Sequence, residues 1–262
     1  MADWLALCRA AVEDVRGVLT DLPLRSDREP VVGSGMGGDE TTAIDAAAEH
    51  AILARFEGLD GLTIVSEEVG VIGAGETFVV IDPIDGSLNA KRGIGFFALS
   101  IAVASGPTMA DVDFGFVHDF GTGEEWTATR GEGPRLDGTP LAGELPKEQI
   151  EILAFEATRT VSVAEQAAAV VDLAYRLRIM GSLALSLCHL AAGRIDAVCS
   201  LKPARAVDIA AAQLLVLERG LAIDLPDAPP FAAAPLDVEG RSRVVAAGTP
   251  EVCRQLAHAL SA

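Results

Sequence analysis

Residues 78–89 constrain the fold more than any other part of the chain, because an apolar run leads there directly into two carboxylates. Residues 78–81 predict a buried strand, with Asp82 at its end and with Pro83 unable to continue a strand ladder. Asp85 follows Asp82 across a turn, so the two carboxylates are close enough to share a pair of cations. The segment therefore predicts a buried strand that ends in a cation-binding pair of carboxylates.

Gly86 and Ser87, which follow directly, stand where a helix could begin. The start of a helix presents free backbone N–H groups, which bind anions such as phosphate. Carboxylates and a bound phosphate can lie side by side at such a site if metal ions neutralise the negative charge of both. Oxygen ligands without histidine suit Mg²⁺ rather than Zn²⁺. The structural alternative is an Asp–Pro turn followed by an Asp helix cap, and for an isolated segment of this kind that alternative is favoured.

Two other segments change that balance. Glu67 follows the apolar run of residues 62–65, and Asp208 opens an otherwise apolar, Ala-rich helix predicted over residues 207–219. Each has an ordinary explanation, since acidic residues are common in loops after strands and a helix dipole favours an Asp in the first turn. Together with Asp82, they indicate several carboxylates gathered at one site.

These residues, taken together, resemble the inositol monophosphatase family, and within it an archaeal branch that also hydrolyses fructose 1,6-bisphosphate. The matching segments run through most of the chain: residues 35–39 (Gly-Met-Gly-Gly-Asp) with Asp45, 66–68 (Ser-Glu-Glu), 82–90 (Asp-Pro-Ile-Asp-Gly-Ser-Leu-Asn-Ala), 181–185 (Gly-Ser-Leu-Ala-Leu) and 206–211 (Ala-Val-Asp-Ile-Ala-Ala). The resemblance implies an α+β fold, a layered α/β/α/β/α sandwich, and a phosphomonoesterase that holds two or three Mg²⁺ ions per active site.

The resemblance also implies a role for each metal ligand. Glu67, Asp82 and the backbone carbonyl of Ile84 would hold one Mg²⁺, and Asp82, Asp85 and Asp208 a second. Two such cations can clamp a phosphoryl group between an attacking water and the leaving oxygen. No Cys, His or Asp is placed as an obvious covalent nucleophile, so we expect direct attack by water without a phosphoenzyme.

Further residues are assigned by the same resemblance. Glu67 would help to hold a third, weaker Mg²⁺, with Asp39 contributing from a mobile Gly-rich loop. Ser87 and Asp45 would form the hydroxyl–carboxylate pair that, with Glu67, activates water. The phosphate would lie against the backbone N–H groups of Gly86 and Ser87.

The substrate is expected to be a sugar bisphosphate, because basic residues stand near the predicted pocket and could bind a second phosphate. The alternative is that they only pair with surface carboxylates. Fructose 1,6-bisphosphate is favoured over inositol 1-phosphate, 3′-phosphoadenosine 5′-phosphate and NADP, and a non-catalytic metal-binding relative is the alternative from another class. The expected substrate contacts are Asp85, Arg178, Gly181, Ser182, Lys202 and Arg205.

The charge of the chain excludes two kinds of partner. There are 38 acidic and 20 basic residues, a formal net charge of −18, and the only lysines are Lys91, Lys147 and Lys202. Such a surface repels nucleic acids and anionic lipid, so neither is expected as a partner. An acidic excess with so little lysine suggests adaptation to high salt, although acidity also serves ordinary solubility.

The remaining features describe the setting. The four cysteines form no CxxC pair, so we expect buried thiols in a cytoplasmic protein. Neither a membrane span nor a secretory signal is evident, and the family resemblance implies a homodimer.

A composition change near residues 143–148 divides the chain into a half that carries the metal motifs, 1–145, and a half that supplies Asp208 and the substrate pocket, 146–262. Elements are expected as a Gly-rich loop at 32–39, strands at 63–65, 78–81 and 197–200, an antiparallel meander over 96–129, and helices at 3–19, 42–56, 163–175, 182–192, 207–219 and 250–260.

Overall fold

The framework of the protein is two β-sheets, seen in a computed structural model that describes residues 3–36, 38, 40–147, 149–156 and 159–261. Parallel pairs in both sheets, β3 with β5 and β11 with both β12 and β13, lie among otherwise antiparallel strands. The first sheet comprises β3 (Leu62–Ser66), β4 (Gly70–Gly73), β5 (Thr77–Asp85), β6 (Ala98–Ala104), β7 (Val112–Asp119), β8 (Glu125–Thr129), β9 (Gly133–Leu136) and β10 (Thr139–Pro140), in the order β10-β9-β8-β7-β6-β5-β3-β4. The second comprises β11 (Ile150–Glu156), β12 (Ala174–Arg178), β13 (Ala197–Ser200), β14 (Ala222–Asp224) and β15 (Val245–Ala247), in the order β12-β11-β13-β15-β14.

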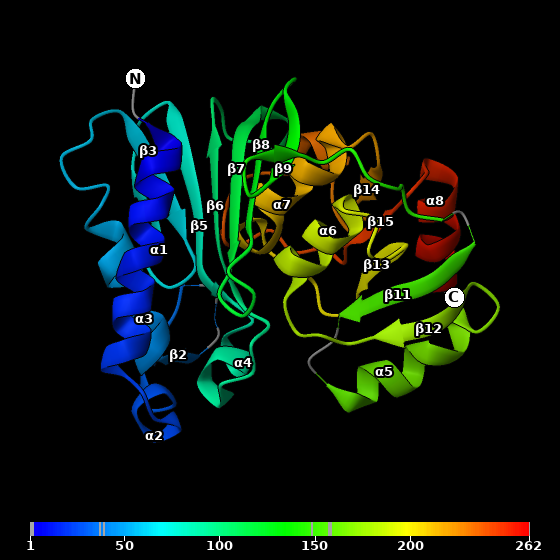
Figure 1. Cartoon of the computed structure of the whole chain (residues 1–262), viewed down its shortest axis with the longest axis horizontal. Helices are drawn as coiled ribbons and strands as arrows, with labels where there is room; N and C mark the ends of the chain where they lie inside the picture. Colours follow the sequence, from blue (N-terminus) through cyan, green and yellow to red (C-terminus); the bar gives the residue numbers. More distant parts are fainter. Residues whose placement is uncertain (1–2, 37, 39, 148, 157–158, 262) are drawn as a thin grey trace.

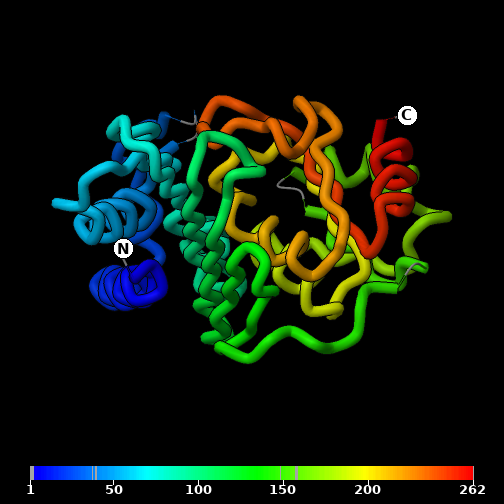
Figure 2. Tube along the Cα trace, turned by 90° about the horizontal axis from the view of Figure 1, so that it is seen from above, coloured from blue at the N-terminus to red at the C-terminus, as the bar shows by residue number. Residues whose placement is uncertain are grey.

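Helices cover both faces of each sheet and produce five layers (Figure 1). On the outer face of the first sheet lie α1 (Trp4–Asp21) and α3 (Ala43–Leu53), whose apolar side chains pack on β5, β6 and β7. Between the sheets lie α6 (Leu183–Ala191) and α7 (Ala206–Glu218), and beyond the second sheet lie α5 (Thr160–Gln166) and α8 (Pro250–Ala259). This confirms the predicted α/β/α/β/α sandwich. The N-terminal α1 and the C-terminal α8 lie at opposite ends of the molecule (Figure 2).

Apolar patterning explains which helix occupies which layer. Helix α1 buries one stripe only, Cys8, Ala11, Val12 and Val15, which is the spacing of a helix with one face in water. Helix α7 is apolar nearly all round, and a helix of that kind must be covered on all sides. It contributes to a core shared with both sheets, so the two predicted halves, 1–145 and 146–262, meet across α7. The division into halves itself stays a prediction.

Most of the expected elements are present, and three differ. Within residues 32–39, expected as a loop, β1 (Val31–Ser34) pairs with β2 (Glu40–Thr42) as an antiparallel hairpin. The helix expected at 163–175 is shorter, because α5 passes into a 3₁₀ turn, Ala167–Val170, and the chain then enters strand β12. Strand β5 continues past Pro83, because the register shifts between Asp82 and Asp85 and so leaves the proline, which has no N–H to donate, outside the ladder.

Short elements complete the described chain: α2 (Arg25–Arg28), α4 (Ser87–Arg92) and the 3₁₀ turns Met109–Asp111 and Phe231–Ala233. All four cysteines are buried and unpaired, as expected. Among the described helices, none combines the length and the apolar character needed to cross a membrane.

Candidate active site

A cavity of about 310 Å³ opens where the carboxyl ends of β3 and β5 meet the starts of α4 and α7. It gathers most of the predicted site residues, although they come from distant parts of the sequence. Those that line it are Asp45, Glu67, Asp82, Ile84, Asp85, Gly86, Ser87, Gly181, Lys202, Arg205 and Asp208.

Parallel pairing of β3 with β5 brings the first two carboxylates together. Ser66 is in register with Ile81, so Glu67 and Asp82, the next residues along each strand path, come side by side at the same end of the sheet. Glu49 on α3 is buried and fixes the turn after β3, since its Oε1 accepts hydrogen bonds from the hydroxyl of Ser66 and from the backbone N–H of Glu68. Glu67 is therefore held in place by the strand pairing before it and by the hydrogen bonds that Glu49 accepts from the residues on either side of it.

The bulge in β5 turns Asp85 toward the second half of the chain. Its Oδ2 accepts hydrogen bonds from the hydroxyl of Ser182 over 2.5 Å and from the backbone N–H of Ala184 over 2.7 Å. Directly after it, Gly86 has φ = 90°, and a Cβ there would lie 3.0 Å from the carbonyl oxygen of Gly181. Only glycine combines this conformation with such a close approach.

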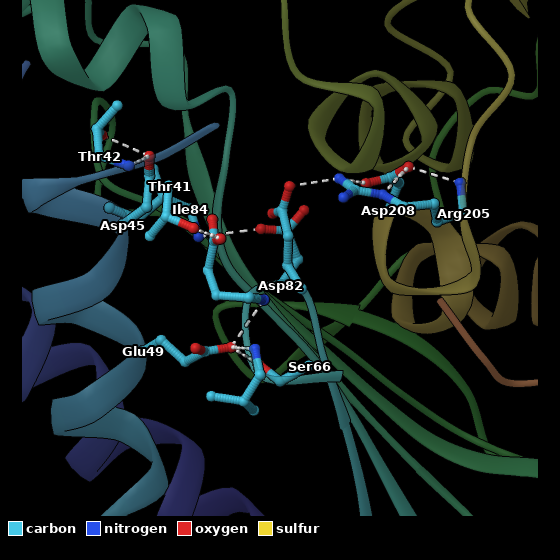
Figure 3. Close-up of polar contacts among 12 residues, drawn as sticks. Thr41, Thr42, Asp45, Glu49, Ser66, Asp82, Ile84, Arg205 and Asp208 are labelled. Atoms are coloured by element: carbon cyan, nitrogen blue, oxygen red, sulfur yellow. Dashed lines mark hydrogen bonds and ion pairs between the residues drawn. The ribbon is translucent and has the colours of Figure 1, made fainter. Parts of the chain in front are cut away.

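Helix α7 presents Asp208 from its first turn. Asp208 Oδ2 accepts a hydrogen bond from the backbone N–H of Arg205 over 2.6 Å, which caps the helix. Arg205 also places its guanidinium inside the carboxylate cluster, where Nη2 lies 3.0 Å from Asp208 Oδ1 and 2.5 Å from Glu67 Oε1 (Figure 3). We expected Arg205 at the pocket rim, whereas its side chain lies inside and is 6% exposed.

Crowding of buried carboxylates makes the cluster unfavourable without cations. Burial, followed by repulsion from Glu67, raises the pKa of Asp82 well above its ordinary value. Burial raises the pKa of Asp85 to about 7, in spite of the opposing hydrogen bond from Ser182. Burial likewise raises the pKa of Glu67 to about 7, although the charge of Arg205 acts in the opposite direction. Such a cluster binds cations, because bound positive charge relieves both repulsion and desolvation.

The donor set fits a hard divalent cation, since Glu67, Asp82, Asp85 and Asp208 all offer carboxylate oxygens at one cavity. In the part of the chain that the structure describes, however, no three acidic, His or Cys side chains already stand in a metal-binding arrangement. The guanidinium of Arg205 occupies the space between two of the donors. The ligands are therefore assembled, but they would have to adjust around a metal ion.

Asp45, expected to help activate water, lies on the other side of the cavity. Its Oδ2 accepts a hydrogen bond from the backbone N–H of Thr42 over 3.3 Å, and so it caps α3 as Asp208 caps α7; the same oxygen also accepts from the Thr42 hydroxyl over 2.5 Å. The ammonium of Lys91 lies 3.5 Å from the same oxygen. Among the described residues no hydrogen bond joins Asp45 to Ser87, the expected partner, although both line the cavity.

Three of the expected residues do not line the cavity or cannot be placed. The side chain of Ser182 is buried and engaged with Asp85. Arg178 is exposed on β12 and donates to the carbonyl oxygen of Leu177. Asp39 lies outside the described residues.

Sequence reasoning missed three residues that shape the site. Glu156 ends β11, lines the cavity and accepts hydrogen bonds from the backbone N–H of Gly181 and the hydroxyl of Ser186. Lys91 and Glu49 each stand four residues after an expected site residue on the same helix, so helical periodicity could have found them. An acidic residue after an apolar run, the pattern that indicated Glu67, also marks Glu156.

An acidic cavity between layered sheets, with carboxylates at the end of a bulged strand and at the start of a buried helix, is the arrangement expected of a metal-dependent phosphatase. The model of the inositol monophosphatase family matches residues 5–261, so the chain belongs to that family and is a phosphoric monoester hydrolase. A relative from Archaeoglobus fulgidus, named fructose-1,6-bisphosphatase/inositol-1-monophosphatase, is 32% identical over 94% of this chain and 93% of its own length. A relative of the same name from Methanothermobacter thermautotrophicus is 30% identical over 98% of this chain and 96% of its own. A solved structure described as an inositol monophosphatase-fructose 1,6-bisphosphatase superposes with a TM-score of 0.85 at 28% identity, over 99% of this chain and all of the other.

Proposed function

We propose that the protein uses Mg²⁺ to hydrolyse sugar or inositol phosphates, with fructose 1,6-bisphosphate as the favoured substrate. The observation that carries the proposal is the convergence of Glu67, Asp82, Asp85 and Asp208 on one cavity that also receives the start of α4. These carboxylates, with the carbonyl of Ile84, would hold two or three Mg²⁺ ions. When bound, the ions supply an activated water and stabilise the leaving oxygen.

The protein's own groups would bind and orient the phosphate. The backbone N–H groups of Gly86 and Ser87 are directed to the scissile phosphate in this proposal. Asp45, held by Thr42 and Lys91, would accept the proton of the attacking water, directly or through the Ser87 hydroxyl. These residues all lie on α3, on α4 or at the caps of the two helices, which gives the arrangement a rigid support.

A preference for a bisphosphate is supported by basic residues of the second half. Lys202 is exposed and lines the cavity, where an ammonium can pair with a second phosphate. Arg205 is a second candidate, once its guanidinium is free to turn outward. Replacing Lys202 with Ala should weaken binding of a bisphosphate more than that of a monophosphate, and equal effects would remove Lys202 from this role.

The test of the function is Mg²⁺-dependent phosphate release from fructose 1,6-bisphosphate and inositol 1-phosphate, measured side by side, with chelated protein as the control. A preference for the bisphosphate supports the favoured substrate, and comparable rates indicate a phosphatase of broad range. No release from either substrate would contradict the proposal and favour a nucleotide substrate or a non-catalytic relative that only binds metal.

We also propose a cytoplasmic homodimer adapted to high salt. Buried, unpaired thiols suit a reducing compartment, and the acidic excess suits high salt. The family resemblance implies the dimer, and exposed apolar side chains on β1 and β4, namely Val31, Val32, Val71 and Ile72, are candidates for its interface. Light scattering in high and low salt would measure the oligomeric state directly.

A further inference from the structure

The guanidinium of Arg205 lies between two carboxylates of the acidic cluster and offsets part of their negative charge. One nitrogen, Nη2, contacts both Glu67 Oε1 at 2.5 Å and Asp208 Oδ1 at 3.0 Å, and Nε lies 3.5 Å from Asp208 Oδ2. The side chain of Arg205 is 6% exposed, against 21% for Glu67 and 16% for Asp208. The guanidinium is thus more deeply buried than either carboxylate with which it pairs.

Burial of such a charge has to be compensated by its neighbours. Burial alone would lower the pKa of Arg205, but the attraction of Asp208 and Glu67 outweighs burial, so the pKa is raised. Arg205 is therefore a fixed cation in a cluster whose carboxylates favour any cation. It acts as their counter-ion.

The contacted oxygens are those that a divalent metal would require. Glu67 and Asp208 are assigned to different metal ions in the proposed ligand set, and one guanidinium nitrogen engages both. A guanidinium and a divalent cation compete for these oxygens, because two positive charges held against the same carboxylates repel each other.

Release of the guanidinium would leave the helix that carries Asp208 in place. Asp208 caps α7 by accepting a hydrogen bond from the backbone N–H of Arg205, and this contact does not depend on the orientation of the Arg205 side chain. Arg205 lines the same cavity as the exposed residues Lys202 and Pro203, so the cavity is the space into which its side chain would move.

We propose that Arg205 is the internal counter-ion of the metal-free site, and that a divalent cation must displace its guanidinium from Glu67 and Asp208 toward the substrate side of the cavity. This inference rests on the proposed function, because it concerns the same metal ligands. It makes metal binding and exposure of Arg205 a single event.

The direct test is modification of arginine by phenylglyoxal in the wild-type protein, followed by peptide mass spectrometry, with and without Mg²⁺. Arg205 should react slowly in the metal-free protein and at least about tenfold faster at saturating Mg²⁺, because only the displaced state exposes the side chain. Arg254 on α8, which is 67% exposed, serves as the internal control and should react equally in both conditions.

A second measurement uses calorimetric titration of Mg²⁺ into metal-depleted variants. Arg205→Met should bind Mg²⁺ at least about tenfold more tightly than wild type, because no internal cation has to be displaced. Arg254→Met removes the same charge far from the cavity and should match wild type.

The outcomes distinguish failure of the proposed displacement from failure of the proposed metal site. If Mg²⁺ binds to the wild-type protein but Arg205 stays protected, displacement is wrong and the proposed function stands. If no Mg²⁺ binding is detected in any of the proteins, the metal assignment and the displacement are both overturned.

Discussion

Ser182 and Asp85 are joined by a hydrogen bond of 2.5 Å between the serine hydroxyl and Oδ2 of the carboxylate, although 97 residues separate them in the sequence. Asp85 ends β5 in the first sheet, and Ser182 caps α6, one of the two helices between the sheets. The bond therefore fixes a proposed metal ligand against the layer that the second half of the chain contributes. This makes Ser182 a positioning residue, in place of the direct substrate contact that we expected.

Removal of this hydroxyl should affect both stability and metal binding. Ser182→Ala removes a hydrogen bond to a charged group, which contributes about 1.5–3 kcal/mol, and it also removes the cap of α6. We expect the free energy of unfolding to fall by about 2 kcal/mol and Mg²⁺ affinity to fall several-fold. Urea unfolding and calorimetric titration measure the two effects. An unchanged Mg²⁺ affinity would mean that Ser182 supports only the fold.

Replacement of Asp82 should separate folding from function. Burial and Glu67 raise the pKa of Asp82 well above its ordinary value, so the metal-free protein already favours an uncharged group there. Asp82→Asn has nearly the same shape, and stability in chelator should change by less than about 1 kcal/mol. Phosphate release should fall by at least about 10³-fold, and stabilisation by Mg²⁺ should disappear. Thermal unfolding with and without Mg²⁺ measures this, and a variant that keeps full activity would remove Asp82 from the metal site.

Lys91 should matter to the reaction although sequence reasoning did not select it. Its ammonium lies 3.5 Å from Asp45 Oδ2 in a pair whose side chains are 15% and 11% exposed. We expect Lys91→Met to lower kcat about tenfold, or about 1.4 kcal/mol, with a smaller change in KM, because Asp45 loses the charge that orients it.

The matched control for Lys91 is Lys147→Met, which removes a lysine from an exposed ion pair with Glu151. Exposed pairs of that kind contribute little, so kcat should not change. Lys91→Arg should recover part of the activity. Equal kcat values for the two Met variants would show that Lys91 has no role in the reaction.

Local patterns indicated where the carboxylates of the site stand, because these follow apolar runs or open a helix, and the family resemblance then supplied their expected roles. Asp82 and Glu67 could be singled out since each follows an apolar run of sequence, and the parallel register of Ser66 with Ile81 then places them side by side. The contacts of Arg205 could not be predicted, because the residue is near Asp208 in sequence but meets Glu67 only through the tertiary fold. A basic residue beside a pocket motif does not reveal whether it faces substrate or the carboxylates.

The differences between the expected and the observed elements also arise from long-range contacts. Pro83 was expected to end its strand, but a register shift, which depends on pairing with β6, carries β5 on to Asp85. The apolar residues after α5 have helical spacing, yet Tyr175 lies in β12, where pairing with β11 determines the conformation. In both places long-range pairing outweighs local preference.

Salt should stabilise the protein by screening its surface charge. With a formal net charge of −18, repulsion between surface carboxylates opposes the compact state. Raising KCl from about 0.1 M to about 1 M shortens the screening length from about 10 Å to about 3 Å. We expect the free energy of unfolding to rise by about 1 kcal/mol or more over that interval, with little further gain above it. Stability that does not change with KCl would exclude high-salt adaptation.

The pH dependence of stability should reveal His118, which is buried near α1. Burial, followed by the charge of Arg16, lowers the pKa of His118, while Glu125 and Asp119 on the strands and Glu13 on α1 oppose this only in part. The unfolded chain takes up a proton at His118 near pH 6.5, about the ordinary value, whereas the folded protein does so only at lower pH. Stability from this residue is therefore complete above about pH 6.5 and is lost as the pH falls below it.

His118→Gln should remove this dependence, because glutamine stays neutral. Between about pH 7 and about pH 5.5, wild type should lose unfolding free energy relative to the variant. Glu67 and Asp85, whose pKa values are raised to about 7, titrate in the same interval and have the opposite effect on stability, but they are present in both proteins and cancel in the comparison. His258→Gln, at an exposed position on α8, is the control and should follow the wild-type curve. Parallel curves for wild type and His118→Gln would show that His118 is protonated equally in the folded and unfolded states.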